Sequence, residues 1–255
     1  MSRKKISLIL ITKNESKNIE KHFNWINKLK NIEEIIIIDD YSTDKTKEAL
    51  KKTIKNKEIK FYKRKLNNNF AEQRNFGISK SKYNWIFSID VDEQPSKKLI
   101  GFIDNIDNNQ YKNYSFKRKD FFIGKEIKHG ENNSLYFTRL FNKKYGKFIG
   151  KVHEKWQSNS PTKKTNLTIN HYPHPNLSSL FQKINFYSTI RAQEMYQQKI
   201  KTNLLQIIFF PVGKFIQNYF LRLGFLDGTQ GIILALSMSF HVFLNKSKLW
   251  HLYQK

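Results

Sequence analysis

The chain of 255 residues is long enough for one large domain, or for one domain with an appended helical region. Its 21 Phe and 12 Tyr exclude a disordered chain, and the absence of cysteine excludes disulfide bonds, Cys-based zinc sites and a thiol nucleophile. A formal net charge of +25 favours an anionic partner such as nucleic acid, an anionic membrane surface or a phosphorylated substrate, although Lys scattered over solvated faces explains the charge equally well.

The first apolar run, residues 6–11, has the continuous hydrophobic pattern of a strand buried on both faces. The run is too short for a signal peptide and ends in Thr-Lys-Asn-Glu, so we expect a cytoplasmic protein. A helix is predicted next, with Asn14 or Ser16 as its N-cap, because apolar residues then recur at helical spacing up to about residue 30.

Strands and helices alternate over the following sixty residues. The pattern predicts strands at residues 34–38, 58–63 and 84–89, and helices that end near residue 55 and span 70–80. Ser42 or Thr43 is the expected N-cap of the first of these two helices. This order is typical of an α/β fold with a mostly parallel, Rossmann-like sheet and right-handed crossovers.

Ligands of such sheets bind beyond the carboxyl ends of the strands. The sequence therefore brings four segments to one rim, although they are far apart in the chain. These segments are Thr12 to Glu15, Asp39 to Asp44, Arg64 to Asn69, and Asp90 to Glu93.

The pattern changes after residue 110. Strand-like segments without long helices between them predict an antiparallel extension, and the chain turns helical from Ser178. We therefore expect a main domain at 1–176, with a first half at 1–95 that carries the predicted rim and a second half at 96–176, followed by a helical region at 177–255.

Two apolar stretches of the helical region, residues 204–223 and 231–244, bear on membrane contact. The first contains Lys214 and Arg222, and the second is shorter than the roughly 20 residues that span a bilayer, so neither is expected to cross one. A peripheral helix on the inner face of the cytoplasmic membrane is favoured, with Trp250 among the headgroups. The alternatives are helices that cover the sheet or form a homodimer.

The acidic cluster Asp90-Val91-Asp92-Glu93 follows the apolar strand WIFSI. Asp90 and Asp92 both face a cleft if the strand bends there into a loop, and carboxylate oxygens suit Mg²⁺ or Mn²⁺ bound to a diphosphate. The alternative is a solvated turn rich in Asp. Acidic residues after the second strand can likewise accept hydrogen bonds from a base or ribose, and the Asn14 loop can contact a nucleoside.

These segments together carry a resemblance. ISLILITKNE, IIIIDDYSTD and AEQRNFGISKSKYNWIFSIDVDE resemble the amino-terminal half of family 2 glycosyltransferases, which have the GT-A fold. The similarity covers residues 6 to about 156. RLFNKKYGKFIGKVHEKW and LRLGFLDGTQGIILAL resemble a branch associated with lipopolysaccharide and lipooligosaccharide core sugars.

The resemblance implies an inverting transfer from a nucleotide-diphosphate sugar, most simply a UDP-sugar, to a hydroxyl of a glycan or lipid-linked acceptor. It implies that Asp40 contacts the donor base with Thr12 and Glu15 nearby, that Arg74 approaches the sugar or phosphates, and that Asp90 lies near the ribose or sugar. Asp92 is implied as the principal metal ligand. The family's Asp-Asp-Gly-Ser is Asp39-Asp40-Tyr41-Ser42 here, and Tyr41 argues against positive φ at that position.

An inverting displacement needs one general base for the acceptor hydroxyl. Glu154 is the candidate because it matches the Glu of the family's Val-His-Glu, with His153 as second choice or as a structural histidine. Asp120 and Glu131 are further alternatives. His171 is a candidate to complete the metal shell or contact the diphosphate, although Pro173 indicates a simple turn there.

The main rival from another class is a basic protein that binds nucleic acid or a sugar nucleotide without transferase activity. The sequence contains no helix-turn-helix, zinc-finger or RNP pattern. A nucleotidylyltransferase or a dinucleotide-binding dehydrogenase needs a Gly-rich phosphate loop after the first strand, where this chain has Thr-Lys-Asn-Glu.

Overall fold

The computed structural model describes residues 4–106, 111–132, 135–151, 154–174 and 176–254. These residues form two compact units. The sheet unit comprises residues 1–119 and 134–171, and the helical unit comprises residues 120–133 and 172–255.

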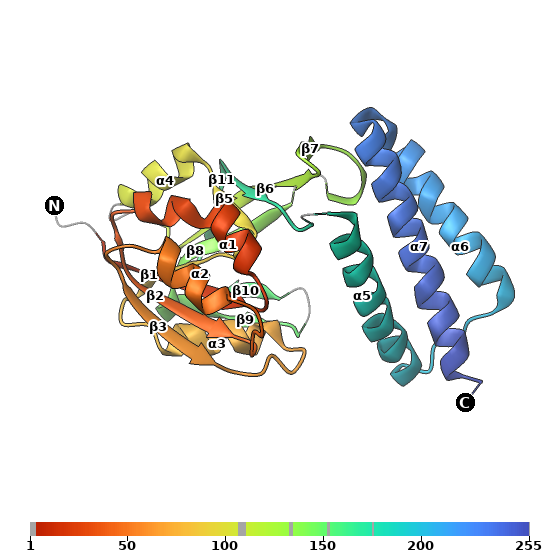
Figure 1. The fold of residues 1–255 in the computed structure, drawn as a ribbon, viewed down its shortest axis with the longest axis horizontal. Coiled ribbons are helices and arrows are strands. Elements are labelled where there is room, and N and C mark those ends of the chain that lie inside the picture. The colour runs from red at the N-terminus through yellow and green to blue at the C-terminus, as the bar shows by residue number, and fades with distance from the viewer. Residues whose placement is uncertain (1–3, 107–110, 133–134, 152–153, 175, 255) are drawn as a thin grey trace. The chain divides into compact units, whose positions relative to one another are not determined.

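The sheet unit begins with alternating strands and helices (Figure 1). These elements are β1 (Ile6–Thr12), α1 (Ser16–His22), the 3₁₀ helix η1 (Phe23–Lys28), β2 (Ile32–Asp39), α2 (Thr46–Thr53), β3 (Glu58–Lys63), α3 (Phe70–Ser79), β4 (Trp85–Ser88), β5 (Glu93–Pro95) and α4 (Lys97–Asp104). The remaining elements are β6 (Asn113–Phe122), whose last three residues belong to the helical unit, β8 (Tyr136–Asn142), η3 (Lys143–Tyr145), β9 (Gly146–Ile149), β10 (Lys155–Ser158) and β11 (Thr162–His171).

Within the described residues the main sheet has the strand order β3-β2-β1-β4-β8-β6-β11-β5. The four strands from β3 to β4 are parallel, and β8 pairs antiparallel with both β4 and β6. β9 and β10 form a separate antiparallel pair. The predicted α/β fold with a mostly parallel sheet and an antiparallel extension is confirmed.

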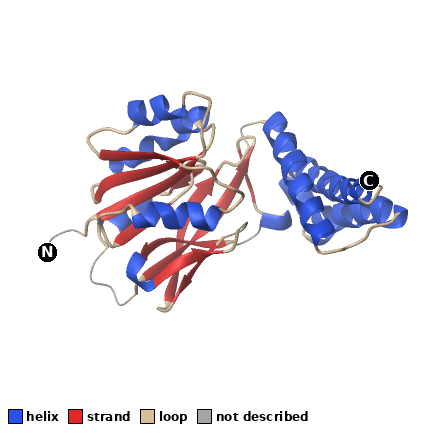
Figure 2. Ribbon diagram, turned by 90° about the horizontal axis from the view of Figure 1, so that it is seen from below, coloured by secondary structure: helices blue, strands red, loops and turns tan. Residues whose placement is uncertain are grey.

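Helices cover both faces of this sheet (Figure 2). Alternate residues of β1 face opposite sides, so Leu8 packs in a core with α1, η1, α2 and α4, whereas Ile9 packs in a core with α3, β8 and β9. Gly77 of α3 allows that helix to approach closely, because a Cβ at this position would lie 2.7 Å from Cγ2 of Ile9. The apolar strands are thus buried on both faces, and this packing fixes the positions of the loops at the rim.

The helical unit contains β7 (Lys125–Ile127), η2 (Gly130–Asn132), α5 (Leu177–Gln197), α6 (Leu204–Ile216), the π-helical segment η4 (Gln217–Leu221), η5 (Gly224–Asp227) and α7 (Thr229–Leu252). α7 packs against both α5 and α6 (Figure 1). β7 pairs with the last residues of β6, and the Asp227 carboxylate anchors this hairpin by accepting hydrogen bonds from the backbone N–H groups of Lys128 and His129.

Element boundaries differ from the sequence predictions mainly at helix starts. The predicted caps Ser42 and Thr43 lie outside α2, whose N-cap residue is Lys45. The Asp44 carboxylate accepts the backbone N–H of Thr46 there. The helix predicted up to residue 30 is an α-helix only to His22 and continues as the 3₁₀ helix η1. Several neighbouring residues can serve as N-caps, so the sequence pattern does not distinguish the residue at which each helix begins.

Candidate functional site

The loops after β1 and β2 are joined by side-chain hydrogen bonds. The backbone N–H of Asn14 donates to Oγ of Ser42 at 2.8 Å, and the backbone N–H of Thr43 donates to Oδ1 of Asn14 at 2.8 Å. The backbone N–H of Glu15 donates to Oγ1 of Thr46 at 2.8 Å. Asn14 therefore links two loops rather than capping α1, whose N-cap residue is Glu15.

Asp39 and Asp40 have different surroundings. Asp39 is buried and accepts hydrogen bonds from Oγ1 of Thr12 and from Ser42, so Thr12 and Asp39 shape the loop. Asp40 is at the rim, where its carboxylate accepts from Nζ of Lys13 at 2.6 Å and from the backbone N–H of Leu66 at 3.0 Å. Asp40 is thus the residue of this pair placed for ligand contact, with a lysine beside it.

Tyr41 overturns one expectation. Its φ is +52°, so the position has the left-handed conformation that the side chain was taken to exclude. Hydrogen bonds of the flanking residues Asp40 and Ser42 fix the turn, because the backbone N–H of Asp40 bonds to the carbonyl of Thr12 and the Ser42 N–H bonds to the Asp39 carboxylate. Tertiary contacts therefore impose a conformation that costs a non-glycine residue about 1–2 kcal/mol.

Asp90 lies between two buried arginines. Its Oδ1 accepts from Arg74 at 2.7 Å, and its Oδ2 accepts from Arg139 at 2.8 Å. Burial alone would raise the pKa of Asp90, but the charges of Arg74 and Arg139 outweigh that effect and hold the pKa well below its usual range. Asp90 is consequently an ionised carboxylate with both oxygens engaged.

Glu93 completes this network from the first position of β5. It is buried, accepts from Arg139 at 2.6 Å, and accepts the backbone N–H of Asp90 at 3.1 Å. Burial raises the pKa of Glu93, and the neighbouring Asp90 carboxylate raises it further against the opposing charge of Arg139. The four residues hold the turn after β4 in one shape.

Arg74 also contacts the candidate base. Its Nε donates to Oε1 of Glu154 at 2.7 Å, and its remaining nitrogens bind Ser88 and Asp90. The guanidinium is buried and orients Glu154 and Asp90 by direct contact, and its expected contact with the donor stays a prediction. Of the two candidate catalytic residues, Glu154 is at this network and His153 lies outside the described residues.

Asp92 and His171 meet through a strand pairing. β11 runs antiparallel to β5 with His171 opposite Glu93, and Nε2 of His171 lies 3.5 Å from Oδ2 of Asp92. Both side chains are 15% exposed. Since Mg²⁺ and Mn²⁺ are commonly bound by few protein ligands plus phosphate oxygens and water, the chemistry of this carboxylate–imidazole pair fits a divalent ion.

Both oxygens of Asp90 are paired with arginines in this structure. Among the described residues, no group of three or more His, Asp and Glu side chains is arranged to hold a metal ion. The metal set of Asp90, Asp92 and His171 stays a prediction, in which Asp92 and His171 are the two side chains that lie 3.5 Å apart.

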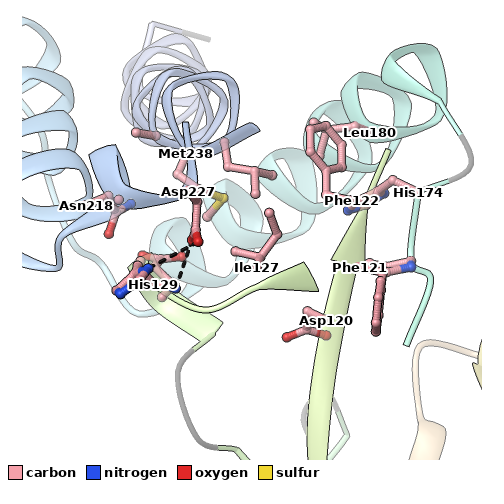
Figure 3. Close-up of a pocket in the computed structure, with 17 residues that line it drawn as sticks. Asp120, Phe121, Phe122, Ile127, His129, His174, Leu180, Asn218, Asp227 and Met238 are labelled. Atoms are coloured by element: carbon pink, nitrogen blue, oxygen red, sulfur yellow. Dashed lines mark hydrogen bonds and ion pairs between the residues drawn. The ribbon is translucent and has the colours of Figure 1, made fainter. Parts of the chain in front are cut away.

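The alternative bases Asp120 and Glu131 belong to the helical unit. They line a pocket of about 110 Å³ in that unit, together with Phe122, Asp227 and other residues (Figure 3). His129 and Asp227 are in contact within this lining, with 3.1 Å between Nδ1 and Oδ1. Glu131 is paired with Lys214, and none of the pocket residues belongs to the rim of the sheet unit.

Sequence reasoning missed two members of the site. Arg139 is one of them, and it is buried against Asp90 and Glu93. Lys13 was not predicted as a site residue, because lysine is too frequent in this chain for a single lysine to be informative. A charged residue inside the otherwise apolar strand YFTRLF was the available signal for Arg139, since buried arginines need acidic partners.

The comparisons with known proteins agree with this geometry. Residues 7–165 match the family model described as glycosyl transferase family 2. The chain belongs to glycosyltransferase family 2. It is 30% identical over 271 residues to a glycosyltransferase of Rickettsia bellii, with 96% of this chain and 86% of the relative covered.

Two further family resemblances are more distant. The chain is 24% identical over 252 residues to the lipopolysaccharide core biosynthesis glycosyltransferase LpsC of Rhizobium meliloti, covering 96% of this chain and 92% of that protein. The fold is similar to that of the mannosyltransferase PcManGT of Pyrobaculum calidifontis, with a TM-score of 0.54, 12% identity, and coverage of 100% of this chain and 89% of that one. The chain is therefore a glycosyltransferase with the GT-A fold.

Proposed function

We propose that this glycosyltransferase moves a sugar from a nucleotide-diphosphate donor, most simply a UDP-sugar, to a hydroxyl of a glycan or lipid-linked acceptor with inversion at the anomeric carbon. The observation that carries the proposal is the Arg74 bridge, which joins the rim carboxylate Asp90 to Glu154. A donor-side group and a candidate base are thereby held within one hydrogen-bonded unit.

The nucleoside half of the donor is assigned to the joined loops after β1 and β2. Asp40 is partly exposed beside Lys13, so it can accept hydrogen bonds from a base while the lysine balances its charge. Asn14 and Glu15 lie in the adjoining loop, and the backbone links between the loops keep this surface in place before the donor arrives.

In the transfer step, the acceptor oxygen attacks the anomeric carbon while the bond from that carbon to the diphosphate oxygen breaks. The acceptor proton passes to the Glu154 carboxylate, and the bonding electrons leave with the diphosphate. The bond from Nε of Arg74 to Oε1 fixes the orientation of the carboxylate. One base and one displacement give inversion.

A divalent ion, Mg²⁺ or Mn²⁺, is assigned to Asp92 and His171. When bound, it would neutralise the charge that develops on the diphosphate. The mannosyltransferase that shares the fold was solved with GDP-mannose and Mn²⁺, which supports this class of cofactor. Asp90 is assigned to the donor sugar or ribose and to holding Arg74.

The acceptor is proposed to be a lipopolysaccharide or another cell-envelope glycan. The similarity to the core glycosyltransferase LpsC supports this role. A lipid-linked acceptor would be met at the inner face of the cytoplasmic membrane, and we propose that the enzyme works there. The rival class, a basic binding protein without transferase activity, is not favoured because the chain belongs to a transferase family and keeps Glu154 at the rim.

The test is a panel of UDP-, GDP- and ADP-sugars incubated with the purified chain and Mn²⁺. Calorimetry reports donor binding, and release of nucleoside diphosphate in the presence of acceptor reports transfer. We expect one donor to bind and to be consumed with inversion of the anomeric configuration. A chain that binds donors but never consumes them in the presence of glycan acceptors would support the rival class.

A further inference from the structure

The outer surface of α6 has the reverse of the polarity expected for a helix in water. An 18-residue window from Leu204 to Leu221 has a mean hydropathy of 1.3, and only 6% of it is buried inside the protein. The apolar side chains that α6 and η4 expose are Leu204, Leu205, Ile208, Phe209, Phe210, Val212, Ile216, Phe220 and Leu221. A contiguous apolar surface of this kind marks a site of contact with another apolar phase.

The polar side chains of these helices are turned inward instead. Nζ of Lys246 on α7 donates to Oε1 of Gln206 on α6, and Oγ of Ser239 donates to the carbonyl of Pro211. Asn218 is buried, and Lys214 is paired with Glu131. Polar groups satisfied inside the bundle with apolar side chains outside are the arrangement that a lipid environment requires.

The side chains that α5 exposes indicate whether lipid could surround the whole bundle. α5 exposes a mixed surface along its length, in which the polar Gln182, Asn185, Thr189 and Gln193 stand among the exposed Phe181, Phe186, Tyr187 and Tyr196. A bundle surrounded by lipid would need an apolar outer face on α5 as well. The asymmetry therefore favours a helix that lies along a membrane surface over one that crosses it, although Leu204–Leu221 is long and apolar enough to cross by length and composition alone.

One end of the bundle carries the residues typical of a lipid headgroup region. The contacts between Lys246 and Gln206 bring the end of α7 to the start of α6. Tyr196 of α5 and Tyr253 after α7 pack edge to face at this end, with 4.8 Å between ring centroids, and Trp250 is exposed nearby in sequence. Lys199, Lys201 and Lys248 add positive charge here, whereas residues 177–255 contain only two acidic residues. Aromatic and basic groups of this kind anchor proteins at anionic membrane surfaces.

We infer that the exposed apolar face of α6 and η4 docks into the surface of a lipid bilayer that contains anionic lipid. This docking surface gives the proposed function its access to a lipid-linked acceptor. It is separable from the transfer chemistry, whose residues lie in the sheet unit.

The test is flotation of the full chain with vesicles of phosphatidylcholine and phosphatidylglycerol. We expect the unmodified protein to float with the vesicles. The double variant Leu205→Glu/Phe209→Glu places charges at two positions that are 63% and 60% exposed, and its partition coefficient into the vesicles is expected to fall by about tenfold or more. Ile149→Glu is the matched control, because Ile149 is an exposed apolar residue of β9 in the sheet unit, and this variant floats like the unmodified protein.

Two results would overturn the inference. One is an unmodified chain that stays with the soluble fraction. The other is a chain that is dimeric without lipid and becomes monomeric in the double variant, since the face would then be covered by a second copy. Donor binding measured by calorimetry on the same preparations separates this question from the proposed function, because the double variant keeps the sheet unit unchanged.

Discussion

Arg74 and Glu154 are separated by 80 positions in the sequence, yet Nε of Arg74 donates to Oε1 of Glu154 at 2.7 Å. The same guanidinium binds Asp90, so one buried cation holds two carboxylates that come from different parts of the sheet unit. Substitution of Glu154 is expected to impair catalysis, whereas substitution of Arg74 is expected to lower stability.

Glu154→Gln is expected to keep donor affinity and lose turnover. The amide oxygen can still accept from Arg74, but the amide cannot take up the acceptor proton, so kcat should fall by about 10²–10⁴-fold. Calorimetry with the donor and a transfer assay measure the two effects on one preparation. A variant with undiminished kcat would place the base elsewhere.

Arg74→Met is expected to destabilise the sheet unit by about 3 kcal/mol, because breaking a buried ion pair leaves uncompensated carboxylates. Glu72→Gln is the matched control, since Glu72 is 61% exposed in its pair with Arg64 and such pairs contribute about 1 kcal/mol or less. Urea unfolding followed by tryptophan fluorescence gives both values. Equal decreases in the free energy of unfolding of the two variants would contradict a structural role for the Arg74 bridge.

Asp92→Asn and His171→Ala are each expected to weaken binding of Mn²⁺ in the presence of nucleoside diphosphate, by about tenfold or more. Asp90→Asn should instead lower stability, because Arg74 and Arg139 lose a charged partner. Glu48→Gln, an exposed charge change on α2, is the control. Electron paramagnetic resonance titration of free Mn²⁺ follows the binding, and unchanged affinity in both variants would remove the metal from this pair.

Acid is expected to destabilise the chain partly through Glu34. Burial would raise the pKa of this carboxyl, but hydrogen bonds from Lys60 and Ser7 outweigh burial and lower the pKa below the ordinary value of a glutamate side chain. The unfolded chain therefore binds a proton at a higher pH than the folded chain does. The stabilisation is fully present above the unfolded pKa and is lost as pH falls through the folded pKa.

Urea midpoints measured from neutral pH down to pH values below 4.5 check this expectation. Glu34→Gln should flatten the acid limb of that profile, because the variant has no proton to take up at this position. A profile as steep as that of the unmodified chain would show that other carboxylates dominate acid unfolding.

Tyr41→Gly is expected to leave stability unchanged or raise it by up to about 1 kcal/mol, since glycine adopts the observed φ of +52° without steric cost. Lys45→Gly is the control at a φ of −82°, where glycine should lower stability slightly. Thermal unfolding of both variants gives the comparison. A clear loss in Tyr41→Gly would mean that contacts of the tyrosine ring outweigh the relief of strain.

The parallel half of the fold was readable from the sequence because its signals are local. Buried strands such as β1 and β2 are continuous apolar runs, and their carboxyl ends must share a rim, which placed Asp40 and Asp90 correctly relative to the sheet. For the antiparallel half, the sequence predicted the presence of strands but not their order or pairing. Nothing local indicates that β11 pairs with β5, so the sequence offered His171 as a candidate for the metal shell without the strand pairing that brings it to Asp92.

The side-chain network was less predictable than the fold. The sequence predicts no partners for Arg74 within the protein, and the structure buries it between Ser88, Asp90 and Glu154. Charge partners separated by up to 80 residues are set by tertiary packing, and neither propensity nor periodicity reports them. The positive φ of Tyr41 has the same origin, since hydrogen bonds from the neighbouring β1 loop determine that turn.

The pairing of β11 with β5 also fixes when the rim is completed during protein synthesis. The ribosome delivers the carboxylates of the 90–93 turn early, long before Glu154 and His171 leave the exit tunnel. A nascent chain that stops before β11 has the parallel half of the sheet but neither the partner strand of β5 nor the imidazole beside Asp92. The contact between Asp92 and His171 can therefore form only after β11 has been synthesised.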